Sequence, residues 1–247
     1  MPRRAFNELR PLSITPHYVS HPEGSALVCY GETKVICTAS LEERVPHWLS
    51  NSGRGWVSAQ YDMLPRATST RRDRDSHRGK LNGRTQEISR LIGRSLRAIV
   101  NLEALSERML TVDCDVIQAD GGTRTASITG AYVALALAFK HMESEKLLRG
   151  QPLKDHVTAV SVGIVDDEPV LDLDYSMDSR AQVDMNIVML GTGTLAEIQG
   201  TGEKRAFTRD EFNVMLDLAL GASANLVELQ KRAIAVELCD EPITVRL

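Results

Sequence analysis

The 247-residue sequence predicts an α+β fold, a single domain over 1–247 made of two similar halves. The main observation is that strand patterns followed by helix patterns occur twice, over residues 1–145 and again over 155–235. A content of 43% hydrophobic and 25% charged residues is typical of a globular protein. Sequence identity between the halves is too weak to count as a detectable repeat. Residues 236–247 form a C-terminal extension without a recognised motif, and a packing strand is its simplest interpretation.

The first half begins with strand patterns. Residues 25–30 and 33–43 flank the dipeptide Gly31-Glu32, which predicts a hairpin with a tight turn. Apolar and polar residues alternate in the second of these segments, as in a strand with one buried face. A further strand is expected over residues 55–62.

A basic segment follows these strands. Between Arg66 and Arg97 there are ten basic residues and three acidic ones, so this segment carries +7 although the whole chain carries −4. The rest of the chain must then carry −11, and this distribution predicts a local binding site for a polyanion. The alternative is a solvated charged loop. Residues 65–83 have few apolar residues and predict a long mobile loop.

Two helices complete the first half. Residues 85–100 place apolar residues at helical spacing, with arginines on the opposite side. A buried strand over 109–117 and a turn over 118–122 lead into a second helix, rich in small residues, over 125–139.

The second half repeats this order. Strands are expected at 158–165, 168–175, 183–190 and 195–200. Thr208 and Glu211 have the spacing of a capping box and predict the start of a helix. Gly221 is expected to end this helix, and another should follow over 222–235.

Some classes of protein are disfavoured. The N-terminal residues lack the apolar stretch of a secretory signal, and no window approaches the roughly 20 uninterrupted apolar residues of a membrane span. We therefore expect a cytoplasmic protein with no membrane partner. The four cysteines lie far apart in apolar surroundings, which favours reduced core residues over disulfides or a metal site; they are Cys29, Cys37, Cys114 and Cys239.

The run Gly121-Gly122-Thr123-Arg124 lies between a predicted strand and a predicted helix. Two glycines allow a tight turn, and the first amides of the helix point unpaired N–H groups at it. Thr123 and Ser127 would add hydroxyl groups, and Arg124 would add a planar guanidinium suited to phosphate oxygens. An anion site is one interpretation, and an ordinary turn with a threonine cap is the other.

Arg84 lies at the start of the helix over 85–100, where the helix dipole disfavours a cation. An anion shared between Arg84 and the first amides would remove this conflict. A solvent-facing arginine is the simpler alternative.

Asp178 and Asp184 form a candidate pair of carboxylates. Residues six apart in one strand would be about 20 Å apart, so the two can meet only if the turn-like residues 178–181 reverse the chain. Two carboxylates beside a phosphate would suit Mg²⁺. The alternative is an unrelated turn residue and strand residue. Asp172 and Asp174 alternate with apolar residues and are assigned to the polar side of a strand.

Taken together, these segments resemble the RNase PH family. The resemblance runs over about residues 5–235 with collinear motifs at matching spacing, and the run 118–127 (QADGGTRTAS) is its most specific part. The other matching motifs are Glu23-Gly24-Ser25, residues 31–35, 63–66, 83–85, 113–116, 161–165 and 184–186.

The resemblance implies duplicated β-α halves like domain 2 of ribosomal protein S5, assembled as a homo-hexameric ring of three dimers. It implies a phosphorolytic 3′-5′ exoribonuclease that releases nucleoside diphosphates, runs in reverse and trims the 3′ ends of transfer and ribosomal RNA. Mapped by position, Arg84, Gly122, Thr123 and Arg124 would bind inorganic phosphate. Asp178 and Asp184 would be catalytic and bind Mg²⁺ or Mn²⁺, Asp184 being the better candidate for general acid. Arg66, Arg71 and Arg74 would bind RNA.

Two other functions compete with this one. A non-catalytic RNA-binding ring subunit of the exosome type would be expected to lack the phosphate arginines or the carboxylates, which this chain keeps. A hydrolytic nuclease would need more clustered carboxylates and no phosphate site.

Overall fold

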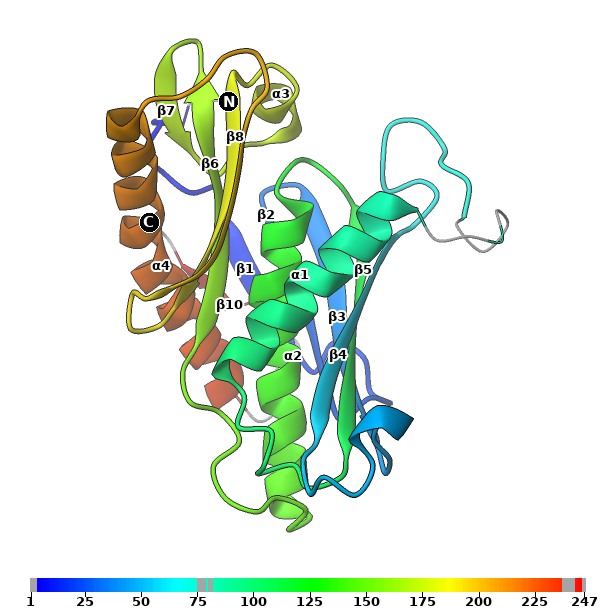
Figure 1. Cartoon of the computed structure of the whole chain (residues 1–247). Helices are drawn as coiled ribbons and strands as arrows, with labels where there is room; N and C mark the ends of the chain where they lie inside the picture. Colours follow the sequence, from blue (N-terminus) through cyan, green and yellow to red (C-terminus); the bar gives the residue numbers. More distant parts are fainter. Residues whose placement is uncertain (1–3, 75–78, 80–81, 237–242, 246–247) are drawn as a thin grey trace.

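A computed structural model describes residues 4–74, 79, 82–236 and 243–245 of the chain. It confirms the α+β fold, with two sheets and helices packed on and between them (Figure 1). One continuous hydrophobic core joins both sheets.

The larger sheet contains six strands in the order β10-β1-β2-β3-β5-β4. Its strands are β1 (Leu12–Pro16), β2 (Gly24–Tyr30), β3 (Thr33–Glu42), β4 (Trp56–Met63), β5 (Met109–Gln118) and β10 (Ile243–Val245). The predicted hairpin is confirmed, since β2 and β3 pair antiparallel around Gly31-Glu32. The sequence pattern missed β1, a short strand ending in proline. β10 lies in the C-terminal extension and pairs with β1.

Two helices pack on this sheet. α1 (Gly83–Ile99) begins two residues before the predicted start and lies against β4, while α2 (Thr123–Ser144) contacts β2, β3 and β6. Nearly every residue of α2 up to Phe139 is buried, because the helix lies between the two sheets. This explains why α2 is apolar all round rather than on one face.

The smaller sheet has four strands in the order β7-β6-β8-β9. They are β6 (Val157–Val165), β7 (Glu168–Leu171), β8 (Val183–Leu190) and β9 (Leu195–Gly202). The predicted strand over 168–175 is too long, since β7 ends at Leu171. A short helix, α3 (Tyr175–Asp178), follows it.

The assignment of Asp172 and Asp174 to the polar side of a strand is wrong. Asp172 is fully buried, with a left-handed φ of 55°, and Asp174 is the N-cap of α3. The alternation with leucines was misleading because the chain leaves the sheet after Leu171. The buried carboxylate of Asp172 is instead paired with Arg4 and Arg10.

The C-terminal helix, α4 (Arg209–Ala235), is continuous, so the predicted break at Gly221 is wrong. A glycine costs a helix interior only about 1 kcal/mol. The apolar side chains beyond Gly221 compensate for this cost because they are buried, as Leu226 and Leu229 show. The predicted capping box of Thr208 and Glu211 is confirmed.

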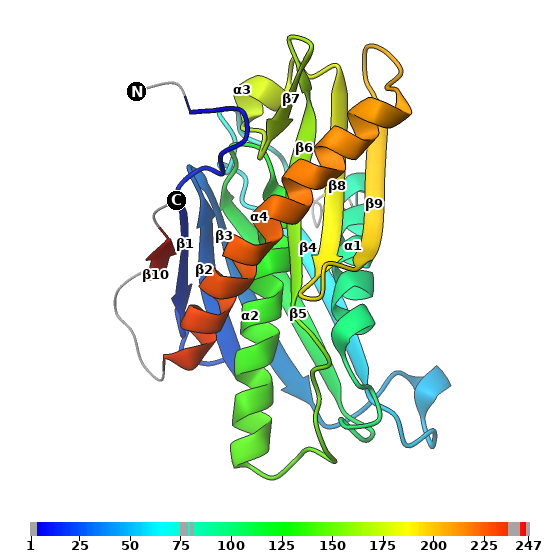
Figure 2. The ribbon, with the colours of Figure 1, turned by 90° about the vertical axis from the view of Figure 1, so that its left-hand side faces the viewer.

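Figure 2 shows α4 running diagonally across α2 and the smaller sheet. Among the described residues, α4 is the one helix long and apolar enough to cross a membrane, a criterion that core helices of globular proteins also meet.

The cysteines are unpaired where the structure describes them. Cys37 and Cys114 are buried and Cys29 is partly buried, in agreement with reduced core residues. Cys239 lies outside the described residues, as do Arg78 and Lys80 of the basic segment.

Candidate active site

A cavity of about 690 Å³ collects most of the predicted site residues. The N-terminal ends of α1 and α2, the helix α3 and the strand β8 each contribute to its wall. The predicted residues that line it are Arg84, Gly122, Thr123, Arg124, Asp178 and Asp184. Residues up to 100 positions apart in sequence therefore meet at one site.

The turn before α2 has the geometry expected for an anion site. Gly121 and Gly122 have φ values of 74° and 64°, in the left-handed region that favours glycine. A Cβ on Gly121 would lie 2.5 Å from the Leu173 carbonyl oxygen, so no other residue fits there. Gly122 is the N-cap of α2, and its carbonyl accepts from Ala126 N–H at 3.0 Å. The preceding amides have no partner within the helix and remain directed at its N-terminal end.

Thr123 and Arg124 are held by specific contacts at this helix end. The Thr123 hydroxyl is 2.8 Å from the hydroxyl of Tyr61, and burial raises the pKa of Tyr61, so this phenol stays neutral. Arg124 Nη1 donates to Gln199 Oε1 at 3.0 Å and to Glu87 Oε1 at 3.4 Å. The prediction that Ser127 adds a hydroxyl donor to the site is wrong. Its hydroxyl is buried and donates to the Thr123 carbonyl instead.

Arg84 lies in the first turn of α1. Asn82 caps this helix by accepting from the Arg84 backbone N–H at 3.0 Å. That amide is therefore already satisfied, and Arg84 lines the cavity.

The two aspartates reach the cavity from opposite sides of a chain reversal, as expected. Asp178 is the last residue of α3, and Asp184 is the second residue of β8, paired with Gly163 and Thr201 on the neighbouring strands. Burial, and then the negative charge of Asp178, raises the pKa of Asp184 to about 6, while Arg124 and Arg84 oppose this rise. The pKa of Asp178 is also raised by burial, against the same two arginines.

The raised pKa of Asp184 predicts a cost to stability. Its ordinary pKa is 3.8, so the folded state binds the proton more tightly than the unfolded state. The contribution of Asp184 to the free energy of unfolding is fully present below its ordinary pKa of 3.8 and is lost as the pH rises through about 6. In metal-free, phosphate-free buffer at pH 8, Asp184→Asn should raise the free energy of unfolding by up to about 3 kcal/mol.

Urea unfolding at two pH values measures this effect. About half of the gain should remain at pH 5, where the wild-type carboxyl is mostly protonated in the folded state. An asparagine variant that is less stable at pH 8, or equally stabilised at both pH values, would contradict the assignment.

The three arginines predicted to contact RNA do not line the cavity. Arg66, Arg71 and Arg74 are exposed on the segment after β4, and Arg71 pairs with Asp73 at 2.9 Å. The described part of this segment, residues 64–74, contains neither helix nor strand. Arg72, which was counted only within the basic segment, does line the cavity.

Sequence reasoning missed several residues of the site. Asn186 and Gln199 face each other across β8 and β9 and both line the cavity. Asn186 could have been found, since it shares the strand face of Asp184. Tyr175 and Glu203 also line the cavity, although no local pattern singles them out.

Comparison with known proteins shows the family to which the chain belongs. The model of domain 1 of the 3′ exoribonuclease family (RNase_PH) matches residues 8–140, and that of domain 2 matches residues 155–222. Ribonuclease PH of Methylorubrum populi is 57% identical over 233 residues, which cover 94% of this chain and 98% of that protein.

Solved structures share the fold. Rice (Oryza sativa) Rrp46 gives a TM-score of 0.77 at 19% identity, over 94% of this chain and 98% of that chain. The Archaeoglobus fulgidus exosome with RNA bound to the active site gives a TM-score of 0.74 at 23% identity, over 91% of this chain and 90% of that chain. The family models and the 57% identity establish kinship beyond the fold, and the chain belongs to the 3′ exoribonuclease family, the family of ribonuclease PH.

Proposed function

We propose that this protein is a phosphate-dependent 3′-5′ exoribonuclease that releases nucleoside diphosphates and also runs in reverse as a nucleotidyltransferase. The observation that carries this proposal is the cavity itself. It brings the N-terminal end of α2 together with three arginines, Arg84 and Arg124 among them, and with four carboxylates that include Asp178 and Asp184. A hydrolase would have no use for a second anion site beside the RNA phosphodiester.

Inorganic phosphate is proposed to bind between Arg84 and Arg124, against the Gly122 turn and the Thr123 hydroxyl. Phosphate and the RNA phosphodiester are both anions, so bringing them together needs fixed positive charge. The two guanidinium groups and the amides of α2 supply it in a preorganised form.

The reaction exchanges one phosphorus–oxygen bond for another. A phosphate oxygen attacks the phosphorus of the last phosphodiester, and the bond from that phosphorus to the 3′ oxygen of the preceding nucleotide breaks. The terminal nucleotide leaves as a nucleoside 5′-diphosphate, and the 3′ oxygen takes up a proton. Asp184, the carboxyl with a pKa of about 6, is proposed to hold that proton for the leaving oxygen.

Asp178 and Asp184 fit a divalent cation, and we propose that they hold Mg²⁺ or Mn²⁺. Burial raises the pKa of both carboxyls, and the negative charge of Asp178 raises that of Asp184 further, so a bound cation would stabilise the charged form of each. The described residues contain no group of three or more protein ligands for a metal, which suits Mg²⁺ because it takes one or two carboxylates together with phosphate oxygens and water. When bound, such a cation supplies positive charge to the phosphate oxygens.

Arg66, Arg71 and Arg74 are proposed to hold the RNA strand outside the cavity. Replacing all three with glutamine should weaken binding of single-stranded RNA and flatten its dependence on salt. The slope of log K against log salt is negative, and loss of three phosphate contacts should reduce its magnitude by about 2. RNA binding titrations at several salt concentrations measure both effects.

A second triple variant provides the control. Arg44, Arg54 and Arg149 are also exposed and do not line the cavity. Arg149 lines a separate groove together with Glu43 and Gly53, the neighbours of the other two arginines. Neutralising them should leave the slope unchanged. If both triple variants have the same slope, the basic loop is not on the RNA path.

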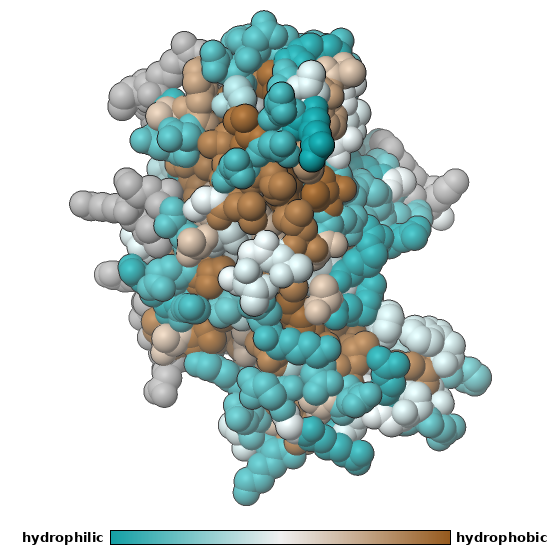
Figure 3. Space-filling model, turned by 60° about the vertical axis from the view of Figure 1, so that its left-hand side comes forward, coloured by the Kyte–Doolittle hydropathy of each residue, from teal (hydrophilic) through white to brown (hydrophobic). Residues whose placement is uncertain are grey.

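We also propose a homo-hexameric ring of three dimers that acts in the cytoplasm on the 3′ ends of transfer-RNA and ribosomal-RNA precursors. Figure 3 shows hydrophobic residues gathered over the face that carries α4. A groove of about 450 Å³ there is lined by Leu9, Leu171, Val214 and Leu218 among others, and Val214 is 46% exposed. An exposed apolar groove supports contact with a second copy. Light scattering should give the mass of six chains of 27.2 kDa, and a monomer would contradict the ring.

The reverse reaction tests the proposed activity. An RNA primer with a free 3′ hydroxyl, ADP and Mg²⁺ should give longer RNA and release inorganic phosphate. A hydrolase cannot perform this reaction. Failure to extend any primer with any nucleoside diphosphate would contradict a phosphorolytic enzyme.

A further inference from the structure

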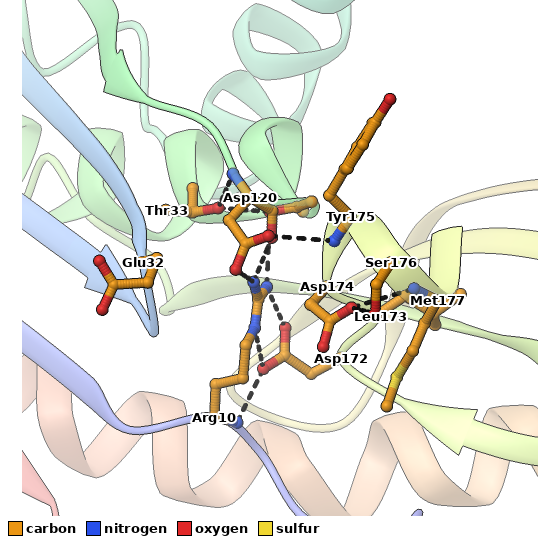
Figure 4. Close-up of polar contacts among 12 residues, drawn as sticks. Arg10, Glu32, Thr33, Asp120, Asp172, Leu173, Asp174, Tyr175, Ser176 and Met177 are labelled. Carbon is orange, nitrogen blue, oxygen red and sulfur yellow. Dashed lines mark hydrogen bonds and ion pairs between the residues drawn. The ribbon is translucent and has the colours of Figure 1, made fainter. Parts of the chain in front are cut away.

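Arg10 is buried beside the proposed phosphate site without lining it. It precedes β1, and its side chain is 7% exposed. Its guanidinium donates to the carbonyl oxygens of Asp120 and Gly121 and, through Nε and Nη2, to both oxygens of Asp172 (Figure 4). All of these acceptors lie more than 100 residues away in sequence.

The two carbonyls that Arg10 holds belong to the phosphate turn. Thr33, also buried, holds the same turn from β3: its hydroxyl donates to Gly121 O at 2.6 Å and accepts from Asp120 N–H at 2.8 Å. In a trans peptide the carbonyl and the following N–H point in opposite directions. Fixing the carbonyls of Asp120 and Gly121 therefore fixes the directions of the Gly121 and Gly122 N–H groups, on the side of the turn away from Arg10.

Asp172 holds Arg10 in this position. Its carboxylate accepts from the Arg10 backbone N–H at 2.8 Å, from Nε at 3.0 Å and from Nη2 at 2.7 Å. The left-handed backbone of Asp172 is disfavoured for most residues and tolerated by aspartate. A two-pronged ion pair of this kind leaves the guanidinium one orientation, so the remaining N–H groups are directed at the turn.

The same contacts connect the turn to the proposed catalytic carboxylates. Asp172 begins the segment that leads into α3, and Asp178 ends that helix. The Gly121 backbone packs directly against residues 173–175, and Tyr175 N–H donates to Asp120 Oδ1 at 3.4 Å. A shift of Arg10 would therefore move the phosphate turn and α3 relative to each other.

We propose that Arg10, oriented by Asp172, is a positioning residue that sets the phosphate turn for its anion and aligns it with α3. This inference rests on the proposed function, because it assumes that inorganic phosphate binds at the Gly122 turn. Arg10 touches neither the phosphate nor the RNA. Its contribution is to the direction of the amides and not to the charge of the cavity wall.

Arg10→Lys in the full-length protein is the main test. Lysine keeps the charge beside Asp172 and loses the fork that reaches both carbonyls. The KM for phosphate should rise about tenfold or more, while the KM for RNA changes little, because a misplaced turn weakens one substrate selectively. Thr33→Val removes the other support of the turn by a smaller change and should have the same selective effect, so the test does not depend on one variant folding.

Arg108→Lys is the matched control. Arg108 likewise joins a carboxylate, Glu43, to a backbone carbonyl, that of Leu147 at 3.0 Å, and it lies outside the cavity. The Arg108→Lys variant should have a KM for phosphate within about twofold of the wild-type value, because Arg108 does not contact the phosphate turn.

Thermal unfolding with inorganic phosphate alone gives a readout without RNA, metal or turnover. Phosphate that binds only the folded state raises the melting temperature. The wild type and Arg108→Lys should be stabilised, and Arg10→Lys and Thr33→Val should need about ten times more phosphate for the same shift. Equal phosphate dependence in all four proteins would overturn the role of Arg10 and leave the proposed function standing. No stabilisation of the wild type would overturn both.

Discussion

Replacing Arg124 with alanine should raise the phosphate concentration needed for half-maximal phosphorolysis by about 100-fold, which corresponds to about 2.7 kcal/mol. Arg124 places a charged fork at the N-terminal end of α2, where Gln199 and Glu87 hold it in the cavity wall. Its loss removes charge-assisted hydrogen bonds to the phosphate. Initial rates at saturating RNA and varied phosphate measure the effect.

RNA binding should suffer much less than phosphate use in this variant. Arg94 provides the control, because it also lies near β9 and pairs with Glu197 at 2.6 Å without lining the cavity. Arg94→Ala should leave the phosphate requirement near the wild-type value. Equal losses in phosphate use and RNA affinity for Arg124→Ala would show that the phosphate site lies elsewhere.

Replacing Asp184 with asparagine should lower kcat by about 1000-fold with a small change in the KM for phosphate. Asparagine keeps the size of the side chain and removes both the titrating proton and the negative charge that would hold a cation. Asp178→Asn should show a similar loss, and the double variant should be little worse than either single one, because the two carboxylates act as a unit. Single-turnover measurements with saturating phosphate and Mg²⁺ separate this loss from product release.

Asp166 offers the control for this pair. It is an exposed carboxylate in the same half of the chain, paired with Arg180 at 2.9 Å and outside the cavity. Asp166→Asn should retain wild-type kcat. Loss of folding would not explain a low kcat in Asp184→Asn, since this variant is expected to be more stable than the wild type even in metal-free, phosphate-free buffer at pH 8. A variant with more than a tenth of wild-type kcat would remove Asp184 from the chemistry.

Much of the site could be predicted from sequence because its signals are local. The two glycines before a helix indicate a turn with free amides, and the turn-like residues after Asp178 indicate a chain reversal that returns Asp184 to the same place. The helix starts were also readable, as the capping box of Thr208 shows.

The buried residues that hold the phosphate turn in place could not be predicted from local sequence patterns. Arg10 and Asp172 are 162 residues apart, and neither lies in a pattern that distinguishes a buried ion pair from a surface charge. Asp172 was misassigned because alternation describes a strand only while the strand continues. Gly221 was misassigned because packing beyond it outweighs its low helix propensity.

The measurement that tests the central claim most directly is product analysis of a single-stranded RNA labelled at its last nucleotide, incubated with the protein and Mg²⁺, with and without inorganic phosphate. The account predicts that a labelled nucleoside diphosphate is released only when phosphate is present. A nucleoside monophosphate released without phosphate would show a hydrolase, and bound RNA with no product in either case would show a non-catalytic RNA-binding subunit; either result would contradict phosphorolysis by this chain.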